Sequence, residues 1–356
     1  MKKVLLLAND VTTILQFRQE LVKALVEDGN EVVVCVPQSD RTPEIEALGA
    51  SVETIEVSRH GKNPLKDIGL YINYKKLIKK INPHIVFSFT IKPNVYGGMA
   101  AGRLRIPYVA NVTGLGVVGD EGLLQKLMLL LYKSGCKRAK CVFFQNKSNL
   151  EFFKKMGVVK ENVQLLPGSG VNVEKFAYMD YPAEGTTNIT FVGRIIKDKG
   201  VFELAEAAKR FANDTRVKFT IVGDVEYGAE NPFEGMENVE CMGFHKDVRP
   251  YLQNSHAVVL PSYHEGMANV LLEGASSGRV ILASRIPGCE ESFDEGVTGF
   301  GLEPKDATSL CDAIEKLLSL SNEQMREMGK AGREKMVQQF NRQIVVNKYL
   351  EELKSV

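Results

Sequence analysis

The chain has 356 residues, of which 44% are hydrophobic, enough for two globular domains of about 150–200 residues, each with its own core. The six cysteines are scattered, as is typical of reduced thiols in a cytosolic protein, and Cys136 and Cys141 have no nearby histidine to complete a zinc site. No stretch is apolar and long enough to predict a secretory signal or a membrane-spanning helix.

The charge is divided unevenly between the two halves of the chain. Residues 1–180 contain 25 Lys and Arg against 17 Asp and Glu, a net charge of +8, so residues 181–356 carry −7. A basic first half suggests an anionic partner, although a random imbalance of surface charge explains the numbers equally well.

Short apolar strands alternate with helical stretches through the first half. Strands are predicted near 3–8, 31–36, 51–57, 84–89, 107–112, 141–145 and 163–166, and helices near 14–28, 66–81, 95–104, 121–136 and 147–156. This alternation predicts a doubly wound parallel sheet, and ligands of such sheets bind beyond the carboxyl ends of the strands.

The first strand-to-helix turn argues against a dinucleotide site. No glycine occurs between residues 1 and 28, whereas backbone that closely approaches a pyrophosphate needs a Gly-x-Gly-x-x-Gly turn. We therefore do not expect NAD binding in this half. The polar residues of the turn are candidate contacts for an acceptor, namely Asn9, Asp10, Thr12 and Thr13. An equally good interpretation is that Asp10 or Thr13 caps the following helix.

Two helical stretches combine lysines with large apolar residues. The first is residues 71–81, YINYKKLIKKI. The second is residues 123–133, LLQKLMLLLYK, and it is followed by Lys137, Arg138 and Lys140. Both patterns fit amphipathic helices that pack on the sheet with solvated lysines. The second is apolar enough to lie on a bilayer while its lysines meet anionic head groups, so peripheral contact with a membrane is a hypothesis for this half.

The loop over residues 111–119, NVTGLGVVG, follows a predicted strand, and its glycines permit close approach to a ligand. Thr113 and Gly114 are candidate sugar contacts, and a loop that closes on the acceptor is an equal alternative. His84, at a strand start, is interpreted as structural. Residues 167–186, which begin with Pro-Gly-Ser-Gly, predict a linker between domains.

The second half opens with a strand, residues 188–192, that leads into a basic motif. Gly193 permits close backbone approach after the strand, and Arg194 and Lys199 bracket the next turn. Two fixed cations in this arrangement can hold a diphosphate. Further strands are predicted near 217–224 and 239–247.

An acidic motif follows at Glu265-Gly-Met-Ala-Asn-Val-Leu-Leu-Glu273, after a buried strand at 257–260 and a Pro-Ser-Tyr-His loop. A helix is predicted from near Met267 to Gly278. Free amides near its start suit a phosphate, namely those of Gly266, Met267, Ala268 and Asn269. Glu273, further along the helix, can accept hydrogen bonds from a diol such as a ribose.

The Glu-x7-Glu motif after a Pro-Ser loop, preceded by Gly-Arg-x4-Lys-Gly, resembles the retaining glycosyltransferases of the GT4 family over nearly the whole chain. The resemblance implies the GT-B fold, with two Rossmann-like domains facing each other across a cleft. Residues 1–170 would bind the acceptor and residues 187–338 the nucleotide sugar. Residues 339–356 would form a helix that crosses back to the first domain.

Three segments look nearest to bacterial enzymes that assemble capsule, lipopolysaccharide or other glycan on a polyprenyl-diphosphate carrier: Phe17-Arg18, Asn111-Val-Thr-Gly-Leu-Gly116 and Pro261-Ser-Tyr-His-Glu-Gly266. Two departures from the family pattern stand out. The first loop lacks the glycines that many GT4 enzymes have there, and Thr113 stands where many have a histidine.

The resemblance implies a hexosyltransferase that moves a hexose or N-acetylhexosamine from a nucleoside-diphosphate sugar, most often a UDP-sugar, to a lipid-linked or other glycan acceptor. Gly193, Arg194 and Lys199 would hold the leaving diphosphate. Glu265 would lie beside the donor sugar and Glu273 would hold the ribose. The loop at Phe244 and His245 would hold the base through backbone groups.

No Asp-x-Asp motif occurs, so we expect no catalytic metal, and we expect no cofactor beyond the nucleotide sugar. No nucleic-acid partner is expected. The expected location is cytoplasmic, with the inner membrane surface as a candidate partner. Two alternatives stay open: a GT-B sugar-nucleotide epimerase, which would consume a UDP-sugar without an acceptor, and a non-catalytic nucleotide-sugar-binding protein.

Overall fold

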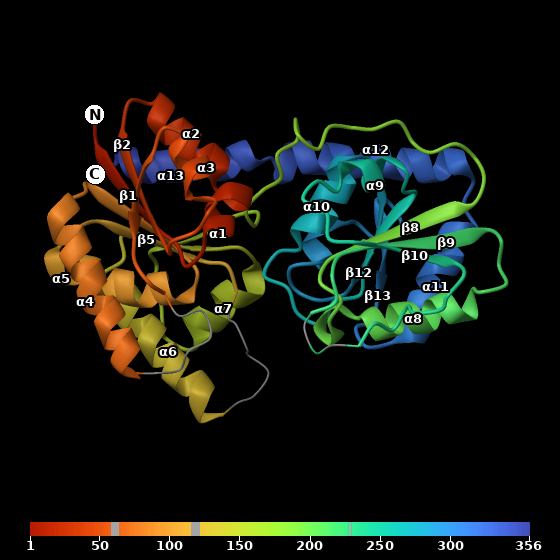
Figure 1. Cartoon of the computed structure of the whole chain (residues 1–356), viewed down its shortest axis with the longest axis horizontal. Coiled ribbons are helices and arrows are strands. Elements are labelled where there is room, and N and C mark those ends of the chain that lie inside the picture. The colour runs from red at the N-terminus through yellow and green to blue at the C-terminus, as the bar shows by residue number, and fades with distance from the viewer. Residues whose placement is uncertain (58–63, 115–121, 227, 229) are drawn as a thin grey trace. The chain divides into compact units, whose positions relative to one another are not determined.

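The computed structural model of the chain describes residues 1–57, 64–114, 122–226, 228 and 230–356. The chain forms two compact units, shown in Figure 1: Met1–Ser169 together with Gln343–Val356, and Gly170–Arg342. The first unit therefore receives the C-terminal segment of the chain. The change from the first to the second unit falls at the Pro-Gly-Ser-Gly segment, where the predicted linker begins.

The described residues of the first unit form a seven-stranded parallel sheet in the order β3-β2-β1-β4-β5-β6-β7. Its strands are β1 (Lys3–Leu7), β2 (Glu31–Val36), β3 (Ser51–Thr54), β4 (Ile85–Phe89), β5 (Tyr108–Val112), β6 (Cys141–Phe144) and β7 (Val163–Leu165). The helices are α1 (Val11–Phe17), α2 (Gln19–Glu27), α3 (Thr42–Glu46), α4 (Pro64–Ile81), η1 (Pro93–Gly97), α5 (Gly98–Leu104), α6 (Leu123–Cys136), α7 (Lys147–Lys155) and α13 (Arg342–Lys354).

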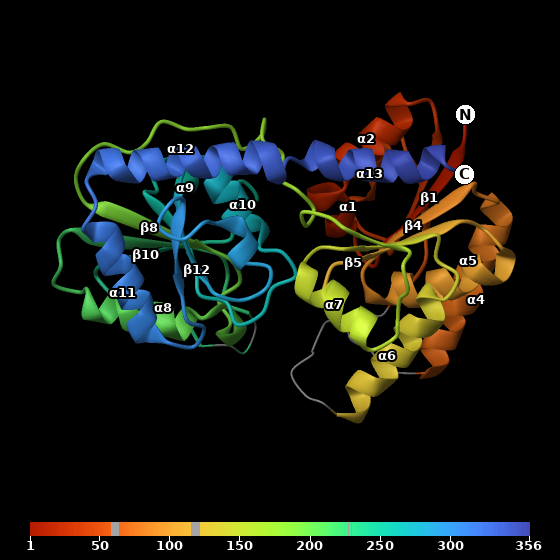
Figure 2. The ribbon, with the colours of Figure 1, turned by 180° about the vertical axis from the view of Figure 1, so that it is seen from behind.

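Both faces of this sheet are covered, which explains the uninterrupted apolar strands of the sequence. Alternate side chains of β1 enter different cores: Leu5 and Leu7 pack with α4, α5 and α6, whereas Val4 and Leu6 pack with α2 and α13. Figure 2 shows α1, α2 and α13 together on one side of the sheet.

The helix predicted over 14–28 is interrupted at Arg18. This residue leaves helical geometry, with φ −134° and ψ 7°, between α1 and α2. Its side chain is buried, and the guanidinium lies over the ring of Phe89, 4.8 Å from the ring centroid. The apolar periodicity continues through the break because both short helices bury residues against the same core.

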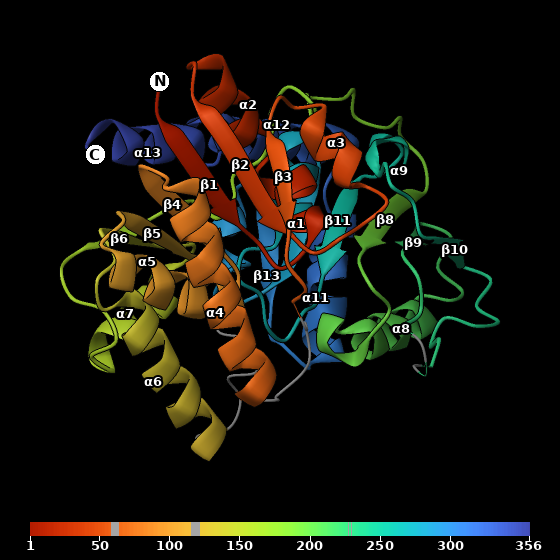
Figure 3. The same ribbon diagram turned by 60° about the vertical axis from the view of Figure 1, so that its left-hand side comes forward.

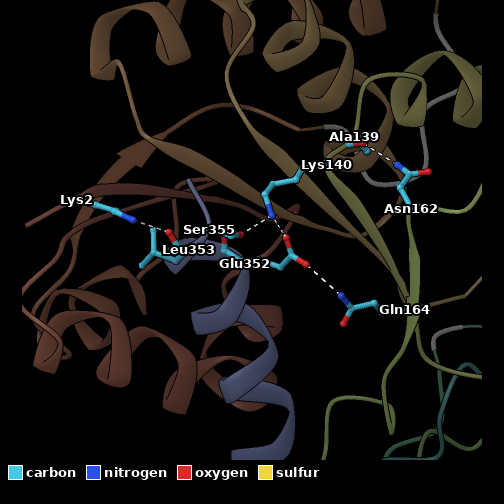
Figure 4. A network of polar contacts seen from close by, with 8 residues as sticks. All are labelled: Lys2, Ala139, Lys140, Asn162, Gln164, Glu352, Leu353 and Ser355. Atoms are coloured by element: carbon cyan, nitrogen blue, oxygen red, sulfur yellow. Dashed lines mark hydrogen bonds and ion pairs between the residues drawn. The ribbon is translucent and has the colours of Figure 1, made fainter.

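The last helix, α13, is held against the first unit by rings and polar contacts. The ring of Tyr349 packs edge-on against Phe87 and Phe143, with 5.0 Å between centroids in each pair. Figure 4 shows the polar contacts near its C-terminal end, where Lys140 binds the carboxylate of Glu352 and the hydroxyl of Ser355. These contacts fix the helix over β4 and β6.

The described part of the second unit has a six-stranded parallel sheet in the order β10-β9-β8-β11-β12-β13. Its strands are β8 (Thr187–Val192), β9 (Val217–Val222), β10 (Val239–Gly243), β11 (Ala257–Leu260), β12 (Val280–Ser284) and β13 (Gly299–Leu302). The helices are η2 (Lys197–Lys199), α8 (Val201–Arg210), α9 (Arg249–Gln253), α10 (Asn269–Ser276), η3 (Glu290–Ser292), α11 (Ala307–Leu318) and α12 (Asn322–Gln339). In Figures 1 and 2, α8 and α11 cover one face of this sheet and α10 and α12 the other.

The predicted α/β class is confirmed in both units, each of which is a Rossmann-like parallel sheet. Because all strands of a sheet point the same way, the loops that follow β8, β9 and β11 emerge at one edge of the second sheet, and β8 and β11 are direct neighbours. The two sequence motifs therefore lie at the same edge, where ligands of such sheets bind.

Candidate active site

Backbone contacts join the loop after β8 to the loop after β11. The amide of Tyr263 donates to the carbonyl of Asp198 at 2.9 Å. Gly200 has φ +69°, and a Cβ added there would lie 2.0 Å from the carbonyl oxygen of Pro261. Glycine is therefore required at the end of the basic motif because any side chain would separate the two loops.

This close approach brings Lys199 and Glu265 together. The Lys199 Nζ lies 2.5 Å from the Glu265 Oε1, and the hydroxyl of Ser262 donates to the same oxygen at 2.8 Å. The side chains of Lys199 and Glu265 are 23% and 13% exposed, so the pair is partly shielded from water. A diphosphate at this edge would compete with Glu265 for the lysine.

Arg194 does not join this pair. Its guanidinium donates to Glu226 Oε1 at 2.8 Å, and its side chain is 64% exposed. An exposed ion pair contributes at most about 1 kcal/mol, so exchanging Glu226 for a ligand phosphate costs little. The structure thus brings Lys199 and Glu265 together and leaves Arg194 accessible in the same loop. Gly193 packs its carbonyl against Gly223, where an added Cβ would lie 1.9 Å away.

The helix α10 begins at Asn269, two residues later than predicted. The reason is that the amide of Ala268 donates to the carbonyl of Gly288 at 2.8 Å, which holds Ala268 at φ −78°, ψ 86°. The Ala268 amide is therefore not free, contrary to the prediction. The amides of Asn269 and Val270 precede the first hydrogen bond of the helix, which the Leu271 amide donates to the Ala268 carbonyl at 3.0 Å.

Two further observations concern the start of α10. The side-chain Oδ1 of Asn269 is buried and has no hydrogen-bond partner among the described residues. Gly288 has φ +89°, and a Cβ there would lie 2.8 Å from the carbonyl of Glu265 and 2.7 Å from that of Gly266. Gly288 therefore supports the Glu265–Met267 turn, a role that the sequence motif does not reveal.

Glu273 lies on the second turn of α10 and is partly buried. Burial raises the pKa of its carboxyl from 4.5 to about 7, although the positive charges of Arg342 and Lys175 act in the opposite direction. Among the residues that the structure describes, none forms a hydrogen bond or ion pair with this carboxylate. A buried acceptor of this kind suits a ligand that brings its own hydroxyl donors.

In the loop after β10, one of the backbone groups expected to bind the base is already engaged within the unit. The amide of Phe244 donates to Asp224 Oδ1 at 3.0 Å, so this amide is engaged within the unit, and a base contact through other backbone groups of the loop stays a prediction. The ring of His245 contacts the Met242 carbonyl through Nε2 at 3.1 Å and lies 4.9 Å from the ring of Tyr251. The ring of Phe244 is exposed, as are the following residues of the loop, His245 included.

The loop after β11 contains a residue that the sequence interpretation missed. The hydroxyl of Tyr263 donates to Glu203 Oε1 at 2.6 Å, and burial together with this carboxylate raises the pKa of the tyrosine. The contact ties the Pro-Ser-Tyr-His loop to the first turn of α8. In the sequence, this role of Tyr263 is indicated only by its position inside the Pro-Ser-Tyr-His motif.

In the first unit, Asp10 is the cap of α1. Its Oδ1 accepts from the Thr13 amide at 2.7 Å and its Oδ2 from the Thr13 hydroxyl at 2.9 Å. The capping alternative is therefore confirmed for Asp10, and both residues are engaged with each other. Asn9 differs, because its Oδ1 is buried and has no hydrogen-bond partner in the part of the chain that the structure describes.

Asn9 and Thr113 follow β1 and β5, which flank β4 in the sheet, so both lie at the carboxyl edge of the first unit. Thr113 and Gly114 are partly exposed there. Gly116 and Gly119 of the predicted glycine-rich loop lie outside the described residues. His84, at the opposite edge, accepts from the Lys3 amide at 2.9 Å, as a structural residue does.

The described residues contain no group of three or more His, Cys, Asp or Glu side chains arranged to hold a metal ion. Nor does any helix in the described ranges combine the length and apolar character needed to cross a bilayer.

Comparison with known proteins assigns the family. A family model described as "Glycosyl transferases group 1" matches residues 186–320, and one described as "Glycosyl transferase 4-like" matches residues 3–146. The chain belongs to this glycosyltransferase family. The resemblance seen in the two motifs is thereby confirmed.

Two curated relatives of this glycosyltransferase come from bacterial glycan assembly. The N,N'-diacetylbacillosaminyl-diphospho-undecaprenol alpha-1,3-N-acetylgalactosaminyltransferase of Campylobacter jejuni is 28% identical, over 97% of this chain and 96% of the relative. The UDP-Gal:alpha-D-GlcNAc-diphosphoundecaprenol alpha-1,3-galactosyltransferase of Escherichia coli is 28% identical, over 78% of this chain and 76% of the relative.

Solved structures confirm the GT-B fold. The structure of HepE from Anabaena, in complex with UDP and glucose, superimposes with a TM-score of 0.80 at 17% identity and covers all of both chains. At that identity the likeness concerns the fold alone.

Proposed function

We propose that this glycosyltransferase moves a hexose or N-acetylhexosamine from a UDP-sugar to a glycan on polyprenyl diphosphate, with retention of the anomeric configuration. The observation that carries the proposal is the Lys199–Glu265 contact at the carboxyl edge of the second sheet, with Arg194 accessible in the same loop. The printed names of the Campylobacter and Escherichia relatives support the lipid-linked acceptor, and the Anabaena complex supports UDP.

The leaving group determines which cations are needed. Breaking the bond between the anomeric carbon and the diphosphate oxygen leaves new negative charge on that oxygen. Arg194 and Lys199, with the first amides of α10, supply positive electrostatic potential for it, so catalysis needs no divalent ion in this scheme. When the donor binds, Arg194 exchanges Glu226 for phosphate and Lys199 exchanges Glu265 for phosphate. Each cation therefore has an anionic partner both with and without the donor.

The two glutamates bind the two sugars of the donor. Once the diphosphate takes Lys199, Glu265 keeps only the Ser262 hydroxyl and can accept hydrogen bonds from hydroxyls of the donor sugar. Its negative charge also stabilises the oxocarbenium-like anomeric carbon. Glu273 accepts from the ribose hydroxyls.

The acceptor attacks from the side that the diphosphate leaves. An acceptor oxygen forms the new bond to the anomeric carbon, the diphosphate oxygen departs with the bonding electrons, and the acceptor proton passes to that departing phosphate. The products are the extended glycan and UDP. Asn9, whose buried Oδ1 has no partner among the described residues, is a candidate in the first unit to bind an acceptor hydroxyl.

Two measurements test the proposal together. Thermal unfolding is followed with UDP, GDP or ADP at about 100 times a plausible Kd, where a bound ligand adds roughly 2.7 kcal/mol. UDP release is then followed with UDP-sugars, with and without undecaprenyl-diphosphate-linked N-acetylhexosamine. We expect stabilisation by UDP alone and release only with the acceptor. Release without an acceptor would identify a hydrolase or a hydrolysing epimerase. Conversion of the UDP-sugar to its epimer without UDP release would identify an epimerase, and binding without release or conversion would identify a sensor.

A further inference from the structure

One surface of the first unit exposes large apolar side chains on two helices. On α6, Leu127 and Leu130 are 53% and 62% exposed, and on α4, Ile68 and Ile72 are 55% and 42% exposed. Single exposed apolar residues are ordinary, whereas two exposed pairs on helices that cover the same sheet face need a reason. Figure 3 shows α4, α5 and α6 on this face.

Lysines extend both apolar pairs along the same helical stripes. Ile68, Ile72 and Lys76 follow one another at i,i+4 spacing on α4. On α6, Lys126 and Lys133 flank the two leucines. In the described part of the chain, none of these three lysines forms an ion pair, and all three are exposed.

Among the described residues, acidic side chains are absent from α5 and α6, and the one on α4 is already engaged. The one acidic residue of α4, Asp67, is bound by Lys92 at 2.8 Å and by the hydroxyl of Tyr96 at 3.0 Å. The face is therefore cationic and apolar together, which is the composition of helices that lie at an anionic bilayer surface.

A shallow pocket of about 280 Å³ lies on this face, lined by residues of α4, α5, α6 and the turn after α6. Three cations line it: Arg103, Lys137 and Arg138. Arg138 donates to the Gly102 carbonyl at 2.8 Å, while Arg103 and Lys137 have no ion-pair partner among the described residues. Its dimensions and charge suit the phosphate of a lipid head group.

We propose that this α4–α6 face docks on an anionic membrane. Leu127, Leu130, Ile68 and Ile72 enter the boundary between head groups and acyl chains, and Arg103, Lys137 and Arg138 bind lipid phosphate in the pocket. The lysines of the two helical stripes meet the surrounding negative surface. The surface goes beyond the proposed transfer reaction and does not depend on which sugar is transferred.

Flotation of the whole protein with vesicles tests the proposal. We expect the chain to float at low salt with mixed phosphatidylglycerol and phosphatidylcholine vesicles, and to stay unbound with pure phosphatidylcholine or at high salt. The double variant L127E/L130E, and separately Lys137→Glu, should partition about tenfold less well or worse.

Two control variants match these changes elsewhere. Lys23→Glu changes an exposed lysine on α2, across the same sheet, and Val337→Glu changes an exposed apolar residue on α12 of the second unit. Both should float like the wild type. All variants are compared by melting temperature and by the melting shift with UDP, which report folding and nucleotide binding apart from the membrane.

Three outcomes would overturn the proposal: no flotation of the wild type with anionic vesicles, equal losses in the controls, or complete competition by free glycerol phosphate. The last would make the pocket a site for a soluble phosphate. None of these outcomes bears on nucleotide binding, so failure of the membrane surface and failure of the transferase assignment are distinguishable.

Discussion

Lys199→Ala tests the central contact of the candidate site. If Lys199 stabilises the leaving diphosphate, its removal should cost about 2–4 kcal/mol of transition-state stabilisation, a fall in kcat/KM of roughly 30- to 1,000-fold. The variant also leaves Glu265, which is 13% exposed, with only the Ser262 hydroxyl. We therefore expect a smaller loss of folding free energy, about 1–3 kcal/mol.

The assay measures the initial rate of UDP release with acceptor present, at several donor concentrations, well below the melting temperature of each variant. Lys197→Ala is the matched control, because Lys197 lies in the same η2 turn and is exposed without an ion-pair partner in the described chain. It should keep kcat/KM within about twofold of wild type. A Lys199→Ala variant with the same near-normal value would refute the leaving-group role.

Glu265→Gln separates the catalytic loss from the loss of the ion pair. It should lower kcat, since the amide keeps the shape of the side chain without its charge. Because the diphosphate takes Lys199 from Glu265 in the proposed scheme, the two residues act separately in the transition state, and the losses in K199A/E265Q should nearly add. A loss much smaller than the sum would mean that the two residues act through their mutual contact instead.

Three further predictions concern the rest of the site. Arg194→Ala should cost a similar amount, about 2–4 kcal/mol of transition-state stabilisation, seen as a fall in kcat/KM. The melting temperature should not change, because the partner Glu226 is exposed, and Glu226→Ala should leave turnover near wild type. Equal effects of the two variants would contradict a phosphate role for Arg194. Glu273→Gln should chiefly raise the donor KM. Burial raises the pKa of Glu273 from 4.5 to about 7, so between these pH values the folded chain retains a proton that the unfolded chain has lost. The free energy of unfolding of the wild type, measured in urea, should therefore fall relative to that of the Gln variant as the pH rises from 4.5 to 7, by at most about 3 kcal/mol. A difference that does not depend on pH would place this carboxyl in water. Excess EDTA should leave UDP release unchanged, and a loss restored by added Mg²⁺ would overturn the cation account.

The parallel sheets were predictable because their central strands are apolar runs that alternate with helical stretches. Both faces of each sheet are covered, so burial imposes the same signal on these central strands. The break at Arg18 was not predictable, since it depends on Phe89, which is distant in sequence. The same holds for α13, whose Tyr349 packs on rings from β4 and β6.

Within the site, residue types were easier to predict than their hydrogen-bond partners. Asp10 is engaged by Thr13 only three residues away, and local capping competes with ligand binding wherever Asp precedes a helix. The amides of Ala268 and Phe244 are engaged by Gly288 and Asp224, each 20 residues away in the chain. No motif reveals such partners, because the contact forms only when neighbouring strands set their loops side by side.

The position of Lys199 against Glu265 shows what the motifs do encode. The two residues are 66 positions apart, yet their contact follows from two local requirements. Gly200 must lack a side chain so that its loop can reach the Pro261 carbonyl, and the Tyr263 amide must find the Asp198 carbonyl. The glycine at the end of the basic motif and the Pro-Ser-Tyr segment before the acidic motif thus act as a matched pair, and together they place a cation and a carboxylate at one point on the sheet edge.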